Sequence, residues 1–71
     1  MTKSTRTAIG NRIRFLREQN ELTQTKFALM VNVERAYLSK LEAGEPNVSI
    51  DVIERIAEGF GMSLSEFFEG I

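Results

Sequence analysis

Apolar residues recur along the chain at the spacing of amphipathic helices, and no stretch alternates in the way that a strand does. In the first such segment Ile9, Ile13 and Leu16 share one helical face, with polar residues between them. The helices predicted by this spacing are about 7–19, 24–31, 35–43, 50–59 and 64–69. Because the connections are short, the pattern predicts one compact all-α domain of five helices over residues 7–71. Residues 1–6 are polar and are expected to form a flexible N-terminal arm.

The ends of the predicted helices carry signals of their own. Four starts have a capping candidate with an apolar residue just before it and another four positions into the helix, the pattern of a hydrophobic staple. These capping candidates are Thr23, Glu34, Ser49 and Ser63. Ser63 also has Glu66 three residues on, which completes a capping box. Helix stops are expected where a residue tolerates a left-handed backbone, at Asn32, Gly44, Gly61 and Gly70.

The last two helices are expected to turn most of their apolar residues into the core. That set is Ile50, Ile53, Ile56, Ala57, Phe60, Leu64 and Phe67. On the second helix, Leu29 and Met30 are apolar as well. We expect one of this pair to enlarge the core, and leave open whether the other does the same or forms a partner surface.

Charge is segregated along the chain, although the net charge is only −1. Residues 1–20 hold five basic residues and one acidic residue, a net +4, whereas residues 45–71 hold one basic residue and six acidic residues, a net −5. A basic first helix lets one face of a weakly acidic molecule meet phosphates. The same charges would also solvate any helical surface, so charge alone does not decide between the two interpretations.

The composition argues against several other classes of protein. The chain has no cysteine or histidine and no glycine-rich phosphate loop, so neither an enzyme nor a metal site is expected. No cofactor and no small-molecule ligand is expected either. No apolar run approaches a membrane span or a signal-peptide core, which predicts a cytoplasmic protein. With 71 residues the core is small, and self-association would bury further apolar surface.

The second and third predicted helices are joined by only about three residues, 32–34, which forces them to cross steeply as in a helix-turn-helix. Such a motif needs five core-facing apolar residues, here Phe27, Val31, Val33, Leu38 and Leu41. It also needs a small residue where the helices meet, which is Ala28, and a residue that accepts positive φ at the turn, which is Asn32. The segment from Gln24 to Leu41 is therefore predicted to be a helix-turn-helix.

Between Ile9 and Phe68 the chain contains, in order, the segments IGNRIRFLRE, LTQTKFA, AYLSKLEAG, NVSIDVIERIAEGFG and SLSEFF. Together they resemble the lambda-repressor-like, Xre-type family of helix-turn-helix regulators. Within that family the short length and the block ERAYLSKLEAGEPNVSI most resemble stand-alone regulators such as the controller proteins of restriction–modification systems. The chain departs from the family at Glu21, where glycine is frequent, and at Glu45 and Pro46, where basic residues often contact phosphate.

The resemblance implies that the third helix, about 35–43, enters the major groove of double-stranded DNA with its N-terminal residues at base edges. The candidate base contacts are Arg35, Ala36, Tyr37 and Lys40. Arg35 is the first choice, because a guanidinium pairs bidentately with guanine O6 and N7. The candidate phosphate contacts are Arg14, Thr23, Gln24, Ser39 and Asn47. Arg17 and Glu42 match a salt bridge that joins the first helix to the third in this family.

The family commonly dimerises at its C-terminal end, so the resemblance implies a homodimer on a pseudo-palindromic operator, with autoregulation as a further expectation. The interface candidates are the apolar residues left over there, Val52, Met62, Phe68 and Ile71. The alternative is a protein-interaction module of antitoxin type, whose main partner is another protein. The features that favour that alternative are the low net charge, Glu34, Glu45 and the apolar pair Leu29 and Met30. Those that favour DNA are Gln24, Arg35 and Lys40 at positions that face DNA.

Overall fold

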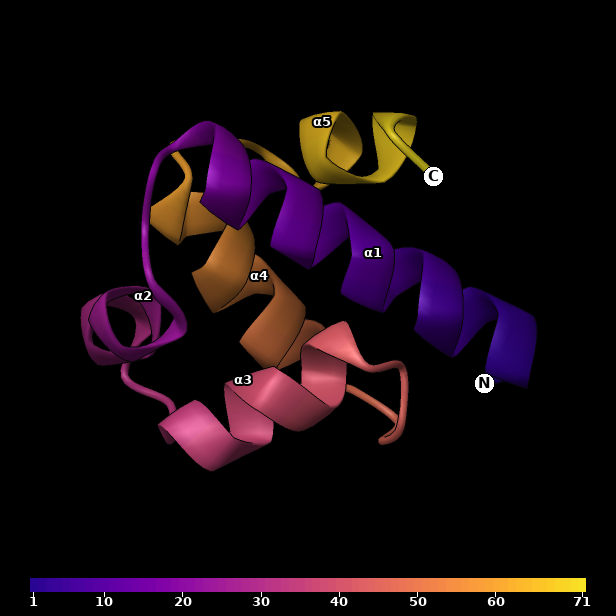
Figure 1. The fold of residues 1–71 in the computed structure, drawn as a ribbon. Coiled ribbons are helices and arrows are strands. Elements are labelled where there is room, and N and C mark those ends of the chain that lie inside the picture. The colour runs from indigo at the N-terminus through magenta and orange to yellow at the C-terminus, as the bar shows by residue number, and fades with distance from the viewer.

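The computed structural model describes all residues from Met1 to Ile71 and contains five helices and no strand (Figure 1). In chain order the helices are α1 Lys3–Gln19, α2 Gln24–Val31, α3 Arg35–Glu42, α4 Ile50–Gly59 and α5 Leu64–Glu69. The longest helix, α1, crosses the molecule, with α5 on one side of it and α2 and α3 on the other (Figure 1). Helix α4 packs against both α2 and α5. The predicted all-α fold of five helices is confirmed.

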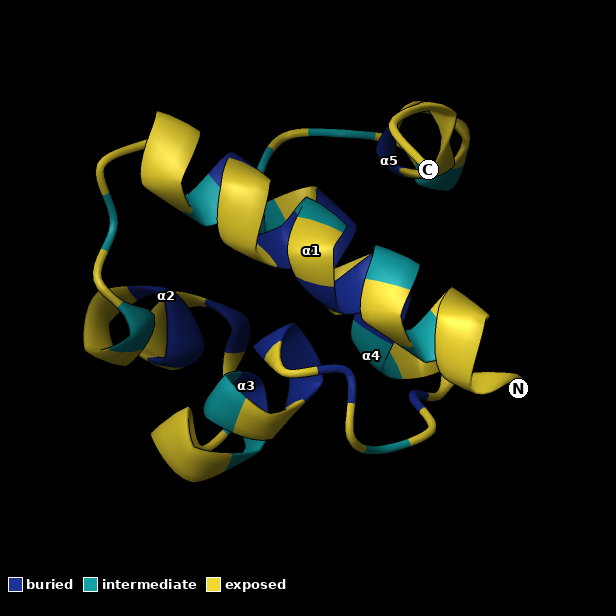
Figure 2. Ribbon diagram, turned by 45° about the vertical axis from the view of Figure 1, so that its right-hand side comes forward, coloured by how far each residue is buried: buried dark blue, intermediate teal, exposed yellow.

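The core lies where these helices meet and consists of thirteen buried apolar residues (Figure 2). Its largest fully buried side chains are Ile13, Phe27, Leu38, Ile53, Ile56 and Phe67. Phe27 of α2 also stacks on the half-buried Phe60, with ring centroids 4.3 Å apart. Because every helix contributes to this one cluster, the orientation of α2 and α3 depends on the packing of the whole domain.

Three apolar residues depart from the expected core. Ile50 is 62% exposed because it is the first residue of α4, whose buried positions begin at Ile53. Leu29 and Met30 are 82% and 55% exposed, since Leu29 lies on the side of α2 opposite its buried residues and Met30 lies at the edge of the buried side. The core position predicted for Ile50 was therefore wrong, and so was the expectation that one of Leu29 and Met30 enlarges the core.

Helix α1 begins at Lys3, four residues earlier than predicted. Thr2 caps it, because the Thr2 hydroxyl accepts a hydrogen bond from a backbone N–H three residues on (3.1 Å). Arg6 then ties this first turn to the loop after α3, donating to the carbonyl oxygen of Gly44 (3.4 Å) and to Oδ1 of Asn47 (3.3 Å). The apolar pattern starts only in the following turn, so it did not reveal that the polar segment is helix rather than a flexible arm.

Three of the four predicted caps form. The side chains of Thr23, Ser49 and Ser63 each accept a hydrogen bond from a backbone N–H three residues on. The carboxylate of Glu66 accepts the N–H of Ser63 (2.9 Å), which completes the predicted capping box and lowers the pKa of Glu66. The prediction for Glu34 was wrong, because its side chain makes no capping bond. Glutamate is not among the short oxygen-bearing side chains that suit this position.

The left-handed backbone conformation predicted at four helix stops is confirmed at three, with φ of 58°, 74° and 70° at Asn32, Gly44 and Gly61. Gly70 does not adopt it, since its φ is −83°. The absence of a side chain at Gly70 instead leaves room for the guanidinium of Arg12, with which a Cβ would clash. Glu21 is left-handed (φ 55°) at the position where glycine was implied, which costs about 1 kcal/mol.

Candidate nucleic-acid interface

The predicted base-contact residues lie together on the outer side of α3. Arg35, Ala36 and Lys40 are exposed, and Tyr37 is half-buried with its side chain against the core. The inner side of the helix is buried. Figures 1 and 2 both show α3 on the opposite side of α1 from α5. The outer side of α3 is therefore free to meet a large ligand without involving the C-terminal end of the chain.

The turn between α2 and α3 is fixed by several independent contacts. The left-handed Asn32 reverses the chain, and the N–H of Val33 donates to the carbonyl oxygen of Ala28 (3.0 Å). The Ala28 side chain is buried, and its small size lets the two helices approach. From α4, Arg55 donates to the carbonyl oxygen of Asn32 (3.1 Å) and so satisfies a backbone group at the end of α2. These contacts hold α3 at a defined angle to α2.

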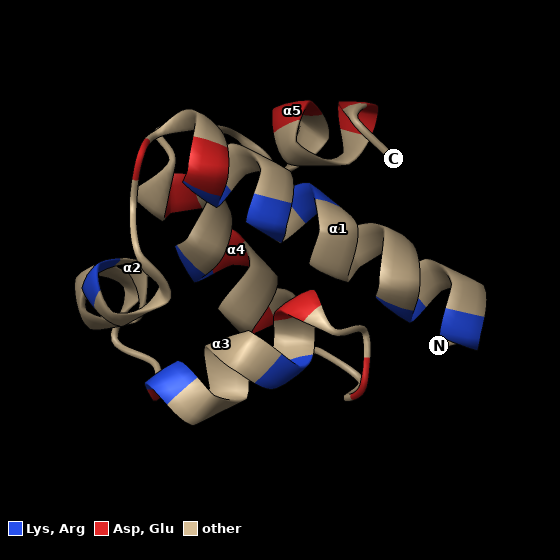
Figure 3. Ribbon diagram, viewed as in Figure 1, with Lys and Arg blue, Asp and Glu red and all other residues tan.

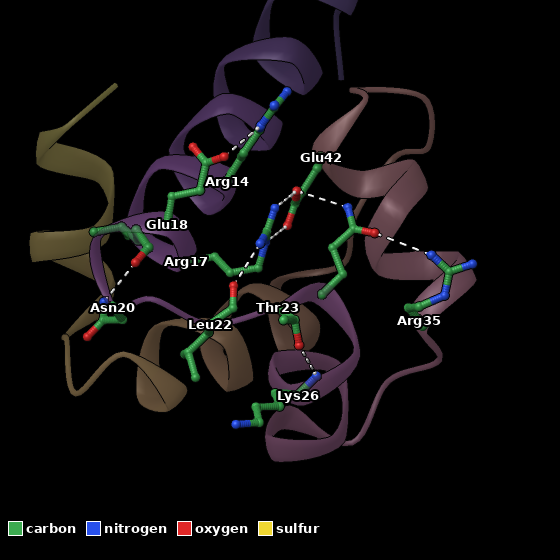
Figure 4. Close-up of polar contacts among 11 residues, drawn as sticks. Arg14, Arg17, Glu18, Asn20, Leu22, Thr23, Lys26, Arg35 and Glu42 are labelled. Carbon is green, nitrogen blue, oxygen red and sulfur yellow. Dashed lines mark hydrogen bonds and ion pairs between the residues drawn. The ribbon is translucent and has the colours of Figure 1, made fainter.

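A chain of hydrogen bonds links α1, α2 and α3 behind this outer side (Figure 4). Arg17 forms a bidentate ion pair with Glu42, with distances of 2.7 Å for Nε–Oε2 and 3.0 Å for Nη2–Oε1. Arg17 Nη1 also donates to the carbonyl oxygen of Leu22 (2.7 Å). Gln24 Nε2 donates to Glu42 Oε1 (3.1 Å), and Gln24 Oε1 accepts from Arg35 Nη1 (3.4 Å). The hydrogen bond to Glu42 raises the pKa of Arg17, which therefore stays protonated.

Three of the candidate phosphate contacts line one shallow groove of about 310 Å³ between α1, α2 and α3. They are Arg14, Gln24 and Ser39. Arg14 also pairs with Glu18 at 3.4 Å, but both side chains are exposed, and such a pair is worth well under about 1 kcal/mol. Arg14 is therefore available to a competing anion. The groove lies directly beside the hydrogen-bond chain, because Arg17 and Glu42 line it as well.

The other two phosphate candidates are engaged within the protein and lie apart from each other. The hydroxyl oxygen of Thr23 accepts the N–H of Lys26 (3.1 Å) at the start of α2. Asn47 lies in the loop before α4, where its side-chain oxygen accepts from Arg6. The structure therefore places Asn47 beside the N-terminal part of α1 and not among the residues that line the groove.

The four interface candidates differ in accessibility. Phe68 is 38% exposed, Ile71 is exposed, and Val52 and Met62 are half-buried against the core. Ile71 also borders a groove of about 570 Å³ whose other apolar wall includes the exposed Phe15 of α1. Phe15 was not among the residues predicted from the sequence. Its position on α1 outside the buried Ile9, Ile13 and Leu16 series was the available signal.

Arg12 has a structural role that was not predicted from the sequence. From α1 its Nε donates to the carbonyl oxygen of Phe67 (2.8 Å), and its Nη2 donates to that of Glu66 (3.1 Å). These carbonyls belong to the last turns of α5, which have no partner within the helix. Arg12 therefore holds the short C-terminal helix against α1, across more than fifty residues of sequence, which no local pattern reveals.

The charges of the folded chain remain segregated. Figure 3 shows basic residues on α1 and α3, whereas α5 carries acidic residues alone. No group of acidic, histidine or cysteine side chains is placed to hold a metal ion. None of the helices combines the length and the apolar character needed to cross a membrane.

A model of the helix-turn-helix family HTH_3 matches residues 13–67, which is more than half of the chain. The chain is an Xre-type helix-turn-helix protein. The matched segment contains α2, α3, the residues of the hydrogen-bond chain and every core residue except Ile9.

Three controller proteins match this Xre-type protein over most of their own length. The control protein C.MunI of a Mycoplasma species is 41% identical over 63 residues, which cover 87% of this chain and 85% of that protein. The restriction–modification controller protein C.AhdI from Aeromonas hydrophila superposes with a TM-score of 0.86 at 29% identity, over 92% of this chain and 98% of that one. The controller C.Esp1396I, solved as a tetramer with its natural 35-base-pair operator, has a TM-score of 0.83 at 30% identity, over 90% and 84%.

These similarities confirm the family that the sequence motifs implied, including its likeness to restriction–modification controllers. The family is one of DNA-binding regulators of transcription and not of catalysts.

Proposed function

We propose that this protein regulates transcription by binding double-stranded DNA sequence-specifically, with α3 in the major groove. The observation that carries the proposal is the placement of Arg14, Gln24 and Ser39 in one groove directly beside the exposed outer side of α3. Groups that grip a phosphate are thereby set next to groups that read bases, which is how a helix-turn-helix docks. The operator complex of C.Esp1396I supports the proposal by similarity.

Within this proposal Arg35 and Lys40 read base edges, and Ala36 leaves space for a thymine methyl group. Tyr37 is half-buried, so its ring is held in place while its hydroxyl reaches a phosphate or a base. Thr23 and the free N–H groups at the start of α2 add a phosphate contact. Asn47, in the loop that follows the C-terminal end of α3, makes a further contact with the DNA backbone.

Changing Arg35 to alanine is expected to relax specificity at one base pair. A bidentate contact to guanine is worth about 1–3 kcal/mol of discrimination, and Arg35 makes only one long hydrogen bond within the protein. The measurement selects bound duplexes from a random pool and then determines the affinity for each variant of the selected site at fixed salt. Arg14→Met is the matched control, since loss of a phosphate contact weakens all sequences alike and reduces the slope of binding against salt by about 1.

If no duplex in the pool binds more tightly than the non-specific level, the proposed regulator function is wrong. The second candidate function, a protein-interaction module of antitoxin type, would then be favoured. The exposure of Leu29 and Met30 side by side on α2 supports that alternative, since both present apolar surface to solvent. If Arg35→Ala keeps the same base preference, the proposed DNA binding still stands, but Arg35 is excluded as the residue that reads the base.

We further propose that the protein acts as a homodimer on a pseudo-palindromic operator, with the two α3 helices about 34 Å apart in successive major grooves. Phe68 and Ile71 form the centre of the interface, and Val52 and Met62 form its edge. The exposed Glu45 repels phosphate near the end of α3 and so weakens the binding of a single protomer to DNA. A dimer compensates for this loss because two protomers bind one operator. Occupancy of the operator then depends steeply on protein concentration, which would allow the protein to regulate its own gene.

Phe68→Ser is expected to weaken the dimer by about tenfold, because it removes much of the apolar area that a phenylalanine buries. Sedimentation equilibrium over a concentration series measures the effect. Leu29→Ser is the matched control, since it makes the same kind of change at a more exposed residue outside the proposed interface. A dimer that is weakened by Leu29→Ser and not by Phe68→Ser would place the interface on α2 instead. Circular dichroism establishes that each variant is folded.

A further inference from the structure

The side-chain amide of Gln24 lies between a buried carboxylate and the residue proposed to read a base. Its nitrogen faces Glu42 Oε1 at 3.1 Å, and its oxygen faces Arg35 Nη1 at 3.4 Å. Gln24 is the first residue of α2, Arg35 is the first residue of α3 and Glu42 is its last, so the amide bridges the two helices of the motif.

The chemistry of the neighbours allows only one orientation of this amide. A carboxylate accepts hydrogen bonds and cannot donate them, so the Gln24 NH₂ must face Glu42. A guanidinium donates and cannot accept, so the Gln24 oxygen must face Arg35. The two requirements agree with each other and with the observed contacts. Rotating the amide by half a turn would set oxygen against oxygen at Glu42 and nitrogen against nitrogen at Arg35.

Glu42 is itself held rigidly. Its side chain is only 5% exposed, and both of its oxygens accept from Arg17, at 2.7 and 3.0 Å. Every buried side-chain polar atom in the domain has a hydrogen-bond partner. No unsatisfied polar group therefore favours another orientation of this carboxylate. Glu42, Gln24 and Arg35 thus form a hydrogen-bonded relay. Its fixed end is the ion pair of Glu42, and its mobile end is the exposed guanidinium of Arg35.

We infer that Glu42 is a positioning residue for base recognition: through the Gln24 amide it orients Arg35 and so sets the base preference of α3. The inference rests on the proposed role of Arg35 as the base reader. An arginine side chain loses considerable rotamer freedom when it is fixed on a base, and a partner that restricts it beforehand reduces that loss. The second hydrogen of the Gln24 NH₂ remains free for a phosphate.

This arrangement separates two effects of Gln24 that are otherwise easily confused. Its phosphate contact contributes equally to every sequence, whereas its contact with Arg35 contributes only where Arg35 finds its preferred base. Removal of the relay must therefore reduce the ratio between the preferred and the substituted base pair, in addition to any uniform loss of affinity. A purely structural role for Glu42 would lower thermal stability and leave that ratio unchanged.

The experiment measures the dissociation constant for the selected operator and for the same operator changed at the base pair that Arg35→Ala relaxes. Gln24→Met is the first variant, because it keeps the length of the half-buried side chain and leaves the Arg17–Glu42 pair intact. We expect it to reduce the ratio of the two dissociation constants by about fivefold, the effect of one orienting hydrogen bond. Glu42→Gln, which can turn its own amide toward Gln24 and reverse it, should reduce the ratio similarly. Arg14→Met, on the same groove, should leave the ratio unchanged.

The decisive comparison repeats Gln24→Met in the Arg35→Ala background. Gln24 then has no guanidinium to orient, so the ratio of the two dissociation constants should not change further. An unchanged ratio in Gln24→Met with intact Arg35 overturns the inference and leaves the proposed function standing. An equal fall of the ratio with and without Arg35 also overturns it, since the relay would not act through Arg35. If Arg35→Ala relaxes no base pair at all, readout by Arg35 fails and the inference fails with it.

Discussion

Replacing Arg17 with methionine is expected to destabilise the domain by about 3 kcal/mol or more. The substitution leaves the Glu42 carboxylate buried without its charged partner and removes the donor to the Leu22 carbonyl oxygen. Breaking one side of a buried ion pair typically costs about 3–5 kcal/mol. A domain of 71 residues lies near the low end of protein stability, about 5 kcal/mol, so most of its margin would be lost. Urea denaturation followed by circular dichroism measures the effect.

The double variant Arg17→Met and Glu42→Met should recover much of that loss, because no uncompensated charge remains in the interior. Arg14→Met provides the control on the same helix. Its ion pair with Glu18 is exposed, and its removal should change the stability by less than about 0.5 kcal/mol. If the single and double variants are equally unstable, the lost packing of the arginine stem and not the buried charge is responsible.

The change Gly10→Ala is expected to destabilise the domain by about 3 kcal/mol, although alanine is the better helix former. Gly10 is buried in α1 where that helix crosses α3, and an added Cβ would clash with the carbonyl oxygen of Leu41 and lie 2.8 Å from that of Glu42. Both atoms belong to backbone, so relief requires α3 to move as a unit. Helix propensity alone predicts the opposite sign, a gain of about 1 kcal/mol. Thermal unfolding therefore distinguishes the two effects, since the clash lowers the melting temperature and helix propensity alone would raise it.

Asn11→Ala is the appropriate control for this second prediction, since Asn11 is exposed on the same turn of α1. It should be neutral or slightly stabilising. A Gly10→Ala protein that is as stable as the parent would mean that α1 and α3 pack less tightly than the structure has them. Gly10→Ala should also weaken DNA binding, because the displaced α3 carries both Glu42 and the proposed base contacts.

The parts of the fold that followed from the sequence are those set by residues close together along the chain. The caps at Thr23 and Ser63 involve residues only three apart, and the left-handed turn at Asn32 is decided by one side chain and its neighbours. These local requirements cannot be met by many other residues, so their presence is informative. The apolar spacing of α1 and α4 is equally local, which is why all five helices were predictable.

The features that were missed depend on contacts between distant segments. Arg12 acts on carbonyl groups of α5, and Arg6 on the loop after α3, so neither role is visible from the neighbouring sequence. The reason for glycine at position 10 lies in the backbone of α3. Helix edges were also misjudged, because Ile50 is apolar yet begins its helix outside the core. At the candidate nucleic-acid interface, the contact residues could be proposed from the sequence, whereas the link from Glu42 through Gln24 to Arg35 could not.

The separation of basic α1 and α3 from acidic α5 gives the molecule an electric dipole despite its net charge of −1. In the field of a polyanion such a dipole experiences a torque, which turns the basic side forward before contact. Approach with α5 forward would be repelled over roughly a Debye length, about 8 Å at physiological salt. The fraction of collisions that arrive in a usable orientation would therefore fall as salt is added, even if the final contacts were unaltered.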